Sequence, residues 1–182
     1  SSRVTVPLAI TDVNVIPMTD TLRIPHQSVL IEDGWITQLG PIASLDLAPD
    51  TQVVDGRGKY LLPGLADMHT HYADAGQSTL YLASGVTLVR NMWGSEFHLE
   101  LSREVESGAT LGPRLFTTTP IIDGSVSPGE GVYPGVTLID DPACAQRLVA
   151  GFAGAGYRAL KIYSFLSPEC TRALGAAARE HD

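Results

Sequence analysis

The feature that most limits how this chain can fold is a change of pattern near residue 60. Before it, short β-rich runs follow one another closely, and Asp33-Gly34 between two apolar runs is a strong signal for a β-hairpin. After it, β-rich runs alternate with helical segments, as in parallel βα units. The sequence therefore predicts a small all-β unit in residues 1–60 and an α/β unit in residues 61–182.

The second unit has room for four strand–helix pairs. We expect strands at residues 61–71, 85–91, 114–119 and 158–163, and helices at 76–83, 96–106, from 141 onward and at 167–180. A long Gly- and Pro-rich loop is expected at 119–136. Four such units form either an open α/β sheet or half of an eight-stranded barrel, which takes about 250 residues.

Charge and hydropathy exclude two classes of partner. The 182 residues include 12 basic and 20 acidic ones, for a net charge of −8. A modest negative charge argues against binding phosphate backbones or anionic membranes, so we expect no nucleic acid as a partner. No apolar run approaches the ~18 residues of a spanning helix, and we expect no membrane partner. Cys144 and Cys170 lack a metal-knuckle spacing and are expected to be free thiols.

Two closely spaced histidines are the sharpest chemical feature. They stand in the run Pro63-Gly64-Leu65-Ala66-Asp67-Met68-His69-Thr70-His71. On a strand, side chains two residues apart point the same way, so His69 and His71 can ligate one metal ion, with Zn²⁺ the usual choice. The alternative is two unrelated surface histidines, because the chain has three more histidines and such a spacing can arise by chance. Among those three, we expect His98 to lie on the surface.

A lysine in a predicted strand is the second candidate. Within the run RALKIY, the side chains of Ala159, Lys161 and Tyr163 share one face. A lysine in a buried strand is unfavourable unless its charge is lost or compensated. The alternative is a lysine whose ammonium group reaches solvent from the end of the strand.

Several of these segments resemble the amidohydrolase superfamily. Residues 53–71, VVDGRGKYLLPGLADMHTH, resemble its first barrel strand through D-G-x-G-K followed by P-G-L-x-D-x-H-x-H. The segments ASGVTLVRNM and GPRLFTTTPII resemble its second and third strands. The resemblance implies an α/β fold, namely the first half of a (β/α)8 TIM-type barrel in residues 61–182. It also implies that residues 1–60 are an incomplete small β-sandwich domain.

The resemblance also implies a metal-dependent hydrolase. His69 and His71 would be metal ligands, and Lys161 would carry a CO2-derived carbamate that bridges two metal ions, most often Zn²⁺. The complete barrel would cleave amide, peptide or cyclic amide C–N bonds through attack by a hydroxide held between the metals. The proton-shuttle aspartate is expected beyond residue 182, so the chain itself offers no catalytic residue. Members of the imidazolonepropionase-like and Xaa-Pro dipeptidase-like branch are the most similar.

Other residues receive secondary roles. Tyr163 and Tyr133 are predicted to contact a small-molecule or peptide substrate, and Asp67 to support the histidines. Asn91 departs from the Arg-Asp pair that relatives often show at the end of the second strand.

Two other hypotheses about the function remain open. One is a one-metal deaminase of the same superfamily, against which the lysine argues. The other is an inactive fragment, or one half of a split enzyme. Because half a barrel exposes a strand edge, such a chain would associate with the missing half of the barrel or, as a homo-oligomer, with further copies of itself.

Overall fold

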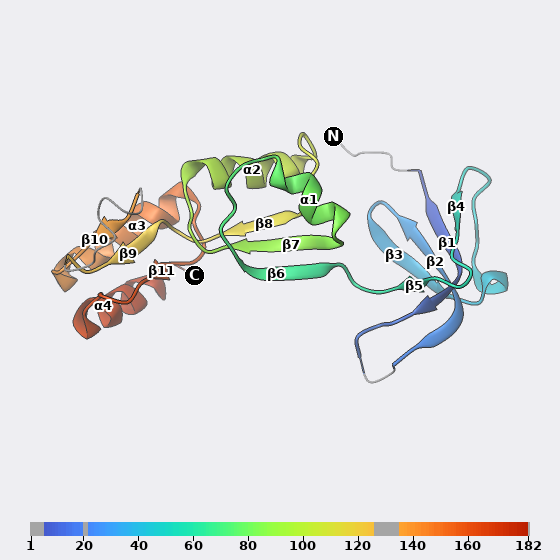
Figure 1. Cartoon of the computed structure of the whole chain (residues 1–182), viewed down its shortest axis with the longest axis horizontal. Helices are drawn as coiled ribbons and strands as arrows, with labels where there is room; N and C mark the ends of the chain where they lie inside the picture. Colours follow the sequence, from blue (N-terminus) through green and yellow to red (C-terminus); the bar gives the residue numbers. More distant parts are fainter. Residues whose placement is uncertain (1–5, 20–21, 126–134, 182) are drawn as a thin grey trace. The chain divides into compact units, whose positions relative to one another are not determined.

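A computed structural model describes residues 6–19, 22–125 and 135–181 (Figure 1). Contacts within the chain divide it into two compact units, residues 1–63 and 64–182. In the part of the chain that is described, no helix is both long and apolar enough to cross a membrane.

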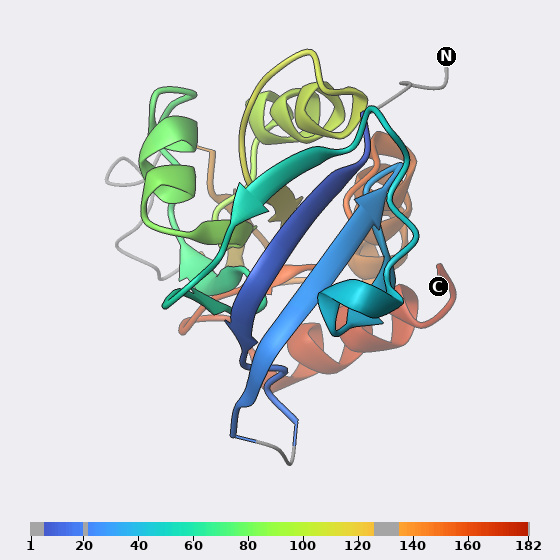
Figure 2. The same ribbon diagram turned by 90° about the vertical axis from the view of Figure 1, so that its right-hand side faces the viewer.

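The first unit is built on one mixed sheet, seen face-on in Figure 2. Its elements are β1 (Leu8–Val15), β2 (Ile24–Glu32), β3 (Trp35–Gly40), the short helix η1 (Ile42–Ser44), β4 (Gln52–Asp55) and β5 (Tyr60–Leu61). The strand order is β3-β2-β1-β4. β3, β2 and β1 pair antiparallel, whereas β4 and β5 both pair with β1 in parallel. A sandwich needs a second sheet, which the described residues of this unit do not form.

The predicted hairpin is confirmed at Asp33-Gly34. Both residues have positive φ, 50° and 81°, and Glu32 pairs with Trp35 across the turn. This is the conformation that a two-residue hairpin turn requires, because its twist matches that of the flanking strands. The side chains of Val13, Val15 and Val29 form the buried cluster of the unit.

The second unit is a succession of parallel strands. They are β6 (Leu65–Thr70), β7 (Val86–Asn91), β8 (Arg114–Thr117), β9 (Ile121–Asp123), β10 (Thr137–Leu138) and β11 (Lys161–Ile162). They pair in the orders β6-β7-β8 and β10-β9-β11. Between β8 and β9, the amide of Thr118 donates to Asn91 and the amide of Thr119 donates to Ala159, at 3.0 and 2.9 Å. The chain thus passes from pairing with β7 to pairing with β11.

Helices alternate with these strands. They are α1 (Gln77–Ala83), α2 (Glu96–Ser107), the short η2 (Pro142–Cys144), α3 (Ala145–Ala155) and α4 (Pro168–Ala178). α1 and α2 lie over the same face of the β6-β7-β8 sheet (Figure 1). Apolar side chains fill two clusters, one with Val89, Leu101 and Leu115 and one with Ile122 and Leu174. Both cysteines are free thiols, as the sequence predicts.

Two expectations about local structure need correction. The segment 119–136 is not loop throughout, because Ile121 and Ile122 are buried and form β9 with Asp123. The strand expected at 158–163 is reduced to Lys161–Ile162. Only these two residues pair with β9, through Ile121 and Ile122.

Candidate functional site

The two candidate histidines lie together at the carboxyl end of β6. Their ring centroids are 5.8 Å apart and the ring planes differ by 28°. Both side chains are solvent-exposed, and the carboxylate of Asp67 accepts a hydrogen bond from the His69 amide at 3.1 Å. The structure therefore brings His69 and His71 side by side, and Asp67 holds the backbone at the His69 amide.

The surroundings of His71 favour its neutral form. Its pKa is lowered first by partial burial and then by the nearby charges of His69 and Lys161. The ring also makes an edge contact with Trp93, at 5.7 Å between centroids. Neutral imidazole is the form that ligates metals, so these surroundings suit a ligand.

Lys161 begins β11 and is half-buried. Its amide donates to the Thr119 hydroxyl at 3.0 Å, which fixes the start of the strand. Its ammonium nitrogen lies 5.6 Å from the centroid of the Tyr163 ring. The structure thus places Lys161 beside Tyr163, and its charge is the smallest of the three causes that lower the pKa of His71. Tyr133 lies outside the described residues.

Few potential metal ligands lie near the two histidines. Among the residues that the structure describes, no three His, Cys, Asp or Glu side chains come close enough together to hold a metal ion. The set is therefore two imidazoles with one amine nearby. Imidazole nitrogen suits Zn²⁺, and a carbamate on the amine would add oxygen donors, so these residues fit such a metal.

Asn91 has a structural role at this end of the sheet. Its side chain is fully buried, and its amide oxygen accepts from the Tyr72 amide at 3.0 Å. Its amide nitrogen donates to the Trp93 carbonyl at 2.9 Å and to the Thr117 hydroxyl at 3.0 Å. Both hydrogens are thus used, and Asn91 joins the ends of three strands.

His98 is not on the surface, contrary to the expectation from the sequence. Its residue is only 7% exposed, with Nδ1 2.8 Å from the Ser95 hydroxyl and Nε2 2.7 Å from the Tyr72 carbonyl. Burial lowers its pKa. The expectation failed because the ring turns inward from the first turn of α2 to a carbonyl far away in the sequence.

A cavity of about 290 Å³ adjoins His71. It lies where the segments after β6 and β7 meet Pro120, and Trp93 forms one of its walls. Sequence reasoning missed Trp93. A usable signal existed, because Trp93 follows a predicted strand by two residues, where barrel enzymes collect active-site residues.

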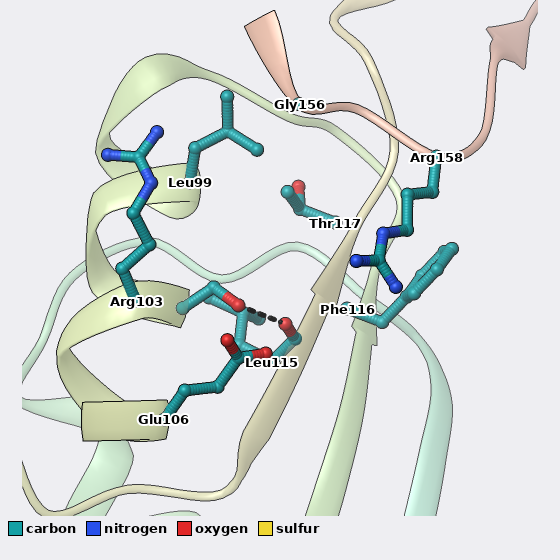
Figure 3. Close-up of a pocket in the computed structure, with 9 residues that line it drawn as sticks. Leu99, Arg103, Glu106, Leu115, Phe116, Thr117, Gly156 and Arg158 are labelled. Carbon is teal, nitrogen blue, oxygen red and sulfur yellow. Dashed lines mark hydrogen bonds between the residues drawn. The ribbon is translucent and has the colours of Figure 1, made fainter. Parts of the chain in front are cut away.

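A second cavity, of about 220 Å³, lies between α2, β8 and the segment before β11 (Figure 3). Arg103 and Glu106 reach it from α2 and Arg158 from the opposite side. The hydroxyl of Ser102, which also lines the cavity, donates to the Leu115 carbonyl at 2.8 Å. None of the candidate metal ligands lines this cavity, so it is separate from the histidine site.

Asp123 is a further residue that the sequence did not single out. It is fully buried at the end of β9, and its Oδ1 accepts from the amides of Gly124 and Phe165, at 3.0 and 2.8 Å. Oδ2 has no hydrogen-bond partner within the described part of the chain. Asp123 therefore ties β9 to the segment that follows Lys161.

Comparisons with known proteins return related sequences and folds, although no model of a protein family matches the chain. Over 63 residues it is 38% identical to an imidazolonepropionase of Symbiobacterium thermophilum; the match covers 32% of this chain and 15% of that protein. Over 51 residues it is 51% identical to a dihydroorotase of Mycobacterium tuberculosis. This match covers 27% of this chain and 11% of that protein.

The structural similarity extends over nearly the whole chain. A crystal structure of a candidate prolidase from Bifidobacterium longum superposes with a TM-score of 0.82 and 26% identity. The superposition covers 98% of this chain and 48% of the other. The chain thus spans about half the length of this structural relative and a smaller share of the curated relatives.

Proposed function

Because this chain belongs to the amidohydrolase superfamily, we propose that it forms the metal-binding part of a hydrolase. Its parallel strands β6, β7, β8 with β9, and β11 would be the first four of a (β/α)8 barrel. The mixed sheet of residues 1–63 would be one layer of a small β-sandwich. The reaction we propose is hydrolysis of amide, peptide or cyclic amide C–N bonds by the complete barrel.

One observation carries this proposal. The rings of His69 and His71 lie 5.8 Å apart at the carboxyl end of β6, and the charge of Lys161 reaches His71. In barrel enzymes, the carboxyl ends of the strands are where catalytic groups gather. In this proposal, three potential ligands from two strands would lie at the carboxyl ends of the strands.

Each residue has a defined part in the proposal. His69 and His71 would each hold a metal ion through a ring nitrogen. The neutral amine of Lys161 would attack the carbon of CO2 and form an N–C bond while one C=O π pair moves onto oxygen, and the nitrogen would lose a proton to solvent. The resulting carbamate has two oxygens that can bridge cations. Asp67 would keep the histidine-bearing backbone in place through its bond to the His69 amide.

Metal ions bound there would polarise the substrate carbonyl and supply an activated water as the nucleophile. Tyr163, beside Lys161, and Tyr133 are proposed to contact the substrate. The proposed substrates are small molecules or peptides.

The proposal is tested by counting metals and detecting the carbamate. We would load the purified protein with Zn²⁺ in ¹³C-bicarbonate, measure the bound metal by mass spectrometry, and look for a carbamate carbon by NMR. The expected result is a carbamate signal that disappears in Lys161→Ala and a metal content that falls in His69→Ala and His71→Ala. His181→Ala is the matched control, since that histidine is exposed and distant in sequence from the proposed ligands.

The outcomes separate the competing functions. One metal per chain with no carbamate would favour a one-metal deaminase. Metal content that is unchanged in all three ligand variants would contradict the proposal.

A further inference from the structure

The cavity beside His71 is built at the ends of three neighbouring strands. His71 and Tyr72 follow β6, Trp93 and Gly94 follow β7, and Pro120 lies between β8 and β9. Its volume of about 290 Å³ is close to the lower limit for pockets that hold small molecules. It could therefore hold one side-chain-sized group.

The walls of this cavity are fixed by buried hydrogen bonds. Asn91 holds the backbone of both Tyr72 and Trp93. The amide of Gly94 donates to the Thr119 carbonyl at 3.0 Å, and a Cβ at Gly94 would overlap the Thr118 carbonyl oxygen. The backbone here packs too closely for any larger residue. The backbone that carries Tyr72, Trp93 and Gly94 in the cavity wall is thus held in place.

The chemistry of the lining is apolar. Trp93, Pro120 and Ala73 are apolar residues of the lining, and no Asp, Glu, Lys or Arg is among its described lining residues. His98 also lines it, but both of its ring nitrogens already face Ser95 and Tyr72. Among the described residues of the lining, no charged side chain is therefore present to pair with a charged ligand.

From this geometry we propose that the cavity receives an uncharged, apolar group of the substrate next to the bond that is cleaved. Trp93 would be the residue that determines this specificity, because it contacts both the cavity and His71. The inference rests on the proposed function in taking His71 as part of the metal centre. It adds the substrate class, namely amides with an apolar side chain beside the scissile bond.

The experiment uses the two tryptophans of the chain as reporters. Trp93 lines the cavity, and Trp35, 77% exposed in the first unit, is an internal control. A Trp35→Phe variant assigns the two indole ¹H–¹⁵N NMR signals. Three probes are titrated, namely the N-acetyl amides of leucine, glycine and glutamate. We expect the leucine probe to shift the Trp93 signal saturably and to bind at least about tenfold more tightly than the other two, because it buries an alkyl side chain.

The signal of Trp35 should stay unchanged throughout. Equal responses to the three probes, or a tighter response to the glutamate probe, would overturn the inference. Co²⁺ is then titrated separately, and its binding at the histidines should broaden the Trp93 signal through the adjacent His71 ring. If Co²⁺ has no effect while the leucine preference persists, the proposed function fails and the apolar ligand cavity stands.

Discussion

The Nε2 atom of His98 lies 2.7 Å from the backbone carbonyl oxygen of Tyr72, the residue that follows His71. A carbonyl oxygen only accepts hydrogen bonds, so Nε2 carries the proton and donates it. Nδ1 is then free to accept from the Ser95 hydroxyl, 2.8 Å away. Both contacts are satisfied by the neutral ring, and α2 is thereby joined to the segment that carries the candidate site.

The first prediction follows from this neutral, buried ring. Burial lowers the pKa of folded His98 below its ordinary value of 6.5. Above pH 6.5 the ring is neutral in both states and its contribution to stability is fully present. As the pH falls below 6.5, the unfolded chain takes up a proton that the folded chain does not. Stability should then decline by up to about 1.4 kcal/mol per pH unit until the folded pKa is reached. Urea unfolding at pH 7.5, 6.5 and 5.5 measures this decline.

A variant isolates the contribution of His98. His98→Gln keeps a donor toward Tyr72 but cannot titrate, so the free energy of unfolding should decline less steeply below pH 6.5. His181→Gln removes an exposed histidine and should leave the decline as it is. An unaltered pH profile in His98→Gln would assign the titration to other groups.

A second prediction concerns the buried amide of Asn91. Asn91→Ala leaves the Tyr72 amide, the Trp93 carbonyl and the Thr117 hydroxyl without this partner. We expect a loss of about 2–4 kcal/mol in the free energy of unfolding. Asn14→Ala is the control, because the Asn14 side chain makes one exposed bond, to the Lys59 carbonyl. Chemical denaturation of both variants checks the difference, and equal losses would refute a special role for Asn91.

A third prediction compares two glycines. A Cβ at Gly94 would overlap the Thr118 carbonyl oxygen, whereas a Cβ at Gly154, inside α3, meets nothing within 4 Å. Gly94→Ala should therefore destabilise the fold by about 2 kcal/mol or more, because backbone must move. Gly154→Ala should stabilise it by about 0.5–1 kcal/mol, since alanine favours the helix. Thermal unfolding of the two variants should shift in opposite directions.

The alternation of strands and helices could be predicted because it depends on local pattern. The Asp33-Gly34 turn, the parallel βα units and the free cysteines all follow from short segments. The length of β11 could not be predicted, since it is set by pairing with β9.

The candidate site could be predicted only in part from the sequence. The pairing of His69 and His71 follows from strand periodicity, and their rings do lie together. The inward turn of His98 toward Tyr72 and the contact of Trp93 with His71 depend on residues that are distant in the sequence. No local pattern contains such contacts. The metal and carbamate roles of these residues stay predictions.

The last prediction tests, without any metal, whether Lys161 belongs with the histidines. Burial, His69 and the positive charge of Lys161 all lower the pKa of His71. Lys161→Met removes one of these charges while keeping an unbranched side chain, so protonation of His71 becomes easier and its pKa should rise. Lys59→Met is the matched control, because Lys59 is exposed and is not among the charges that lower the pKa of His71. An NMR titration of the histidine ring signals, assigned with His71→Gln, measures the pKa in each variant. If the pKa of His71 is the same in Lys161→Met as in the parent chain, Lys161 is too far from His71 to share a metal centre with it.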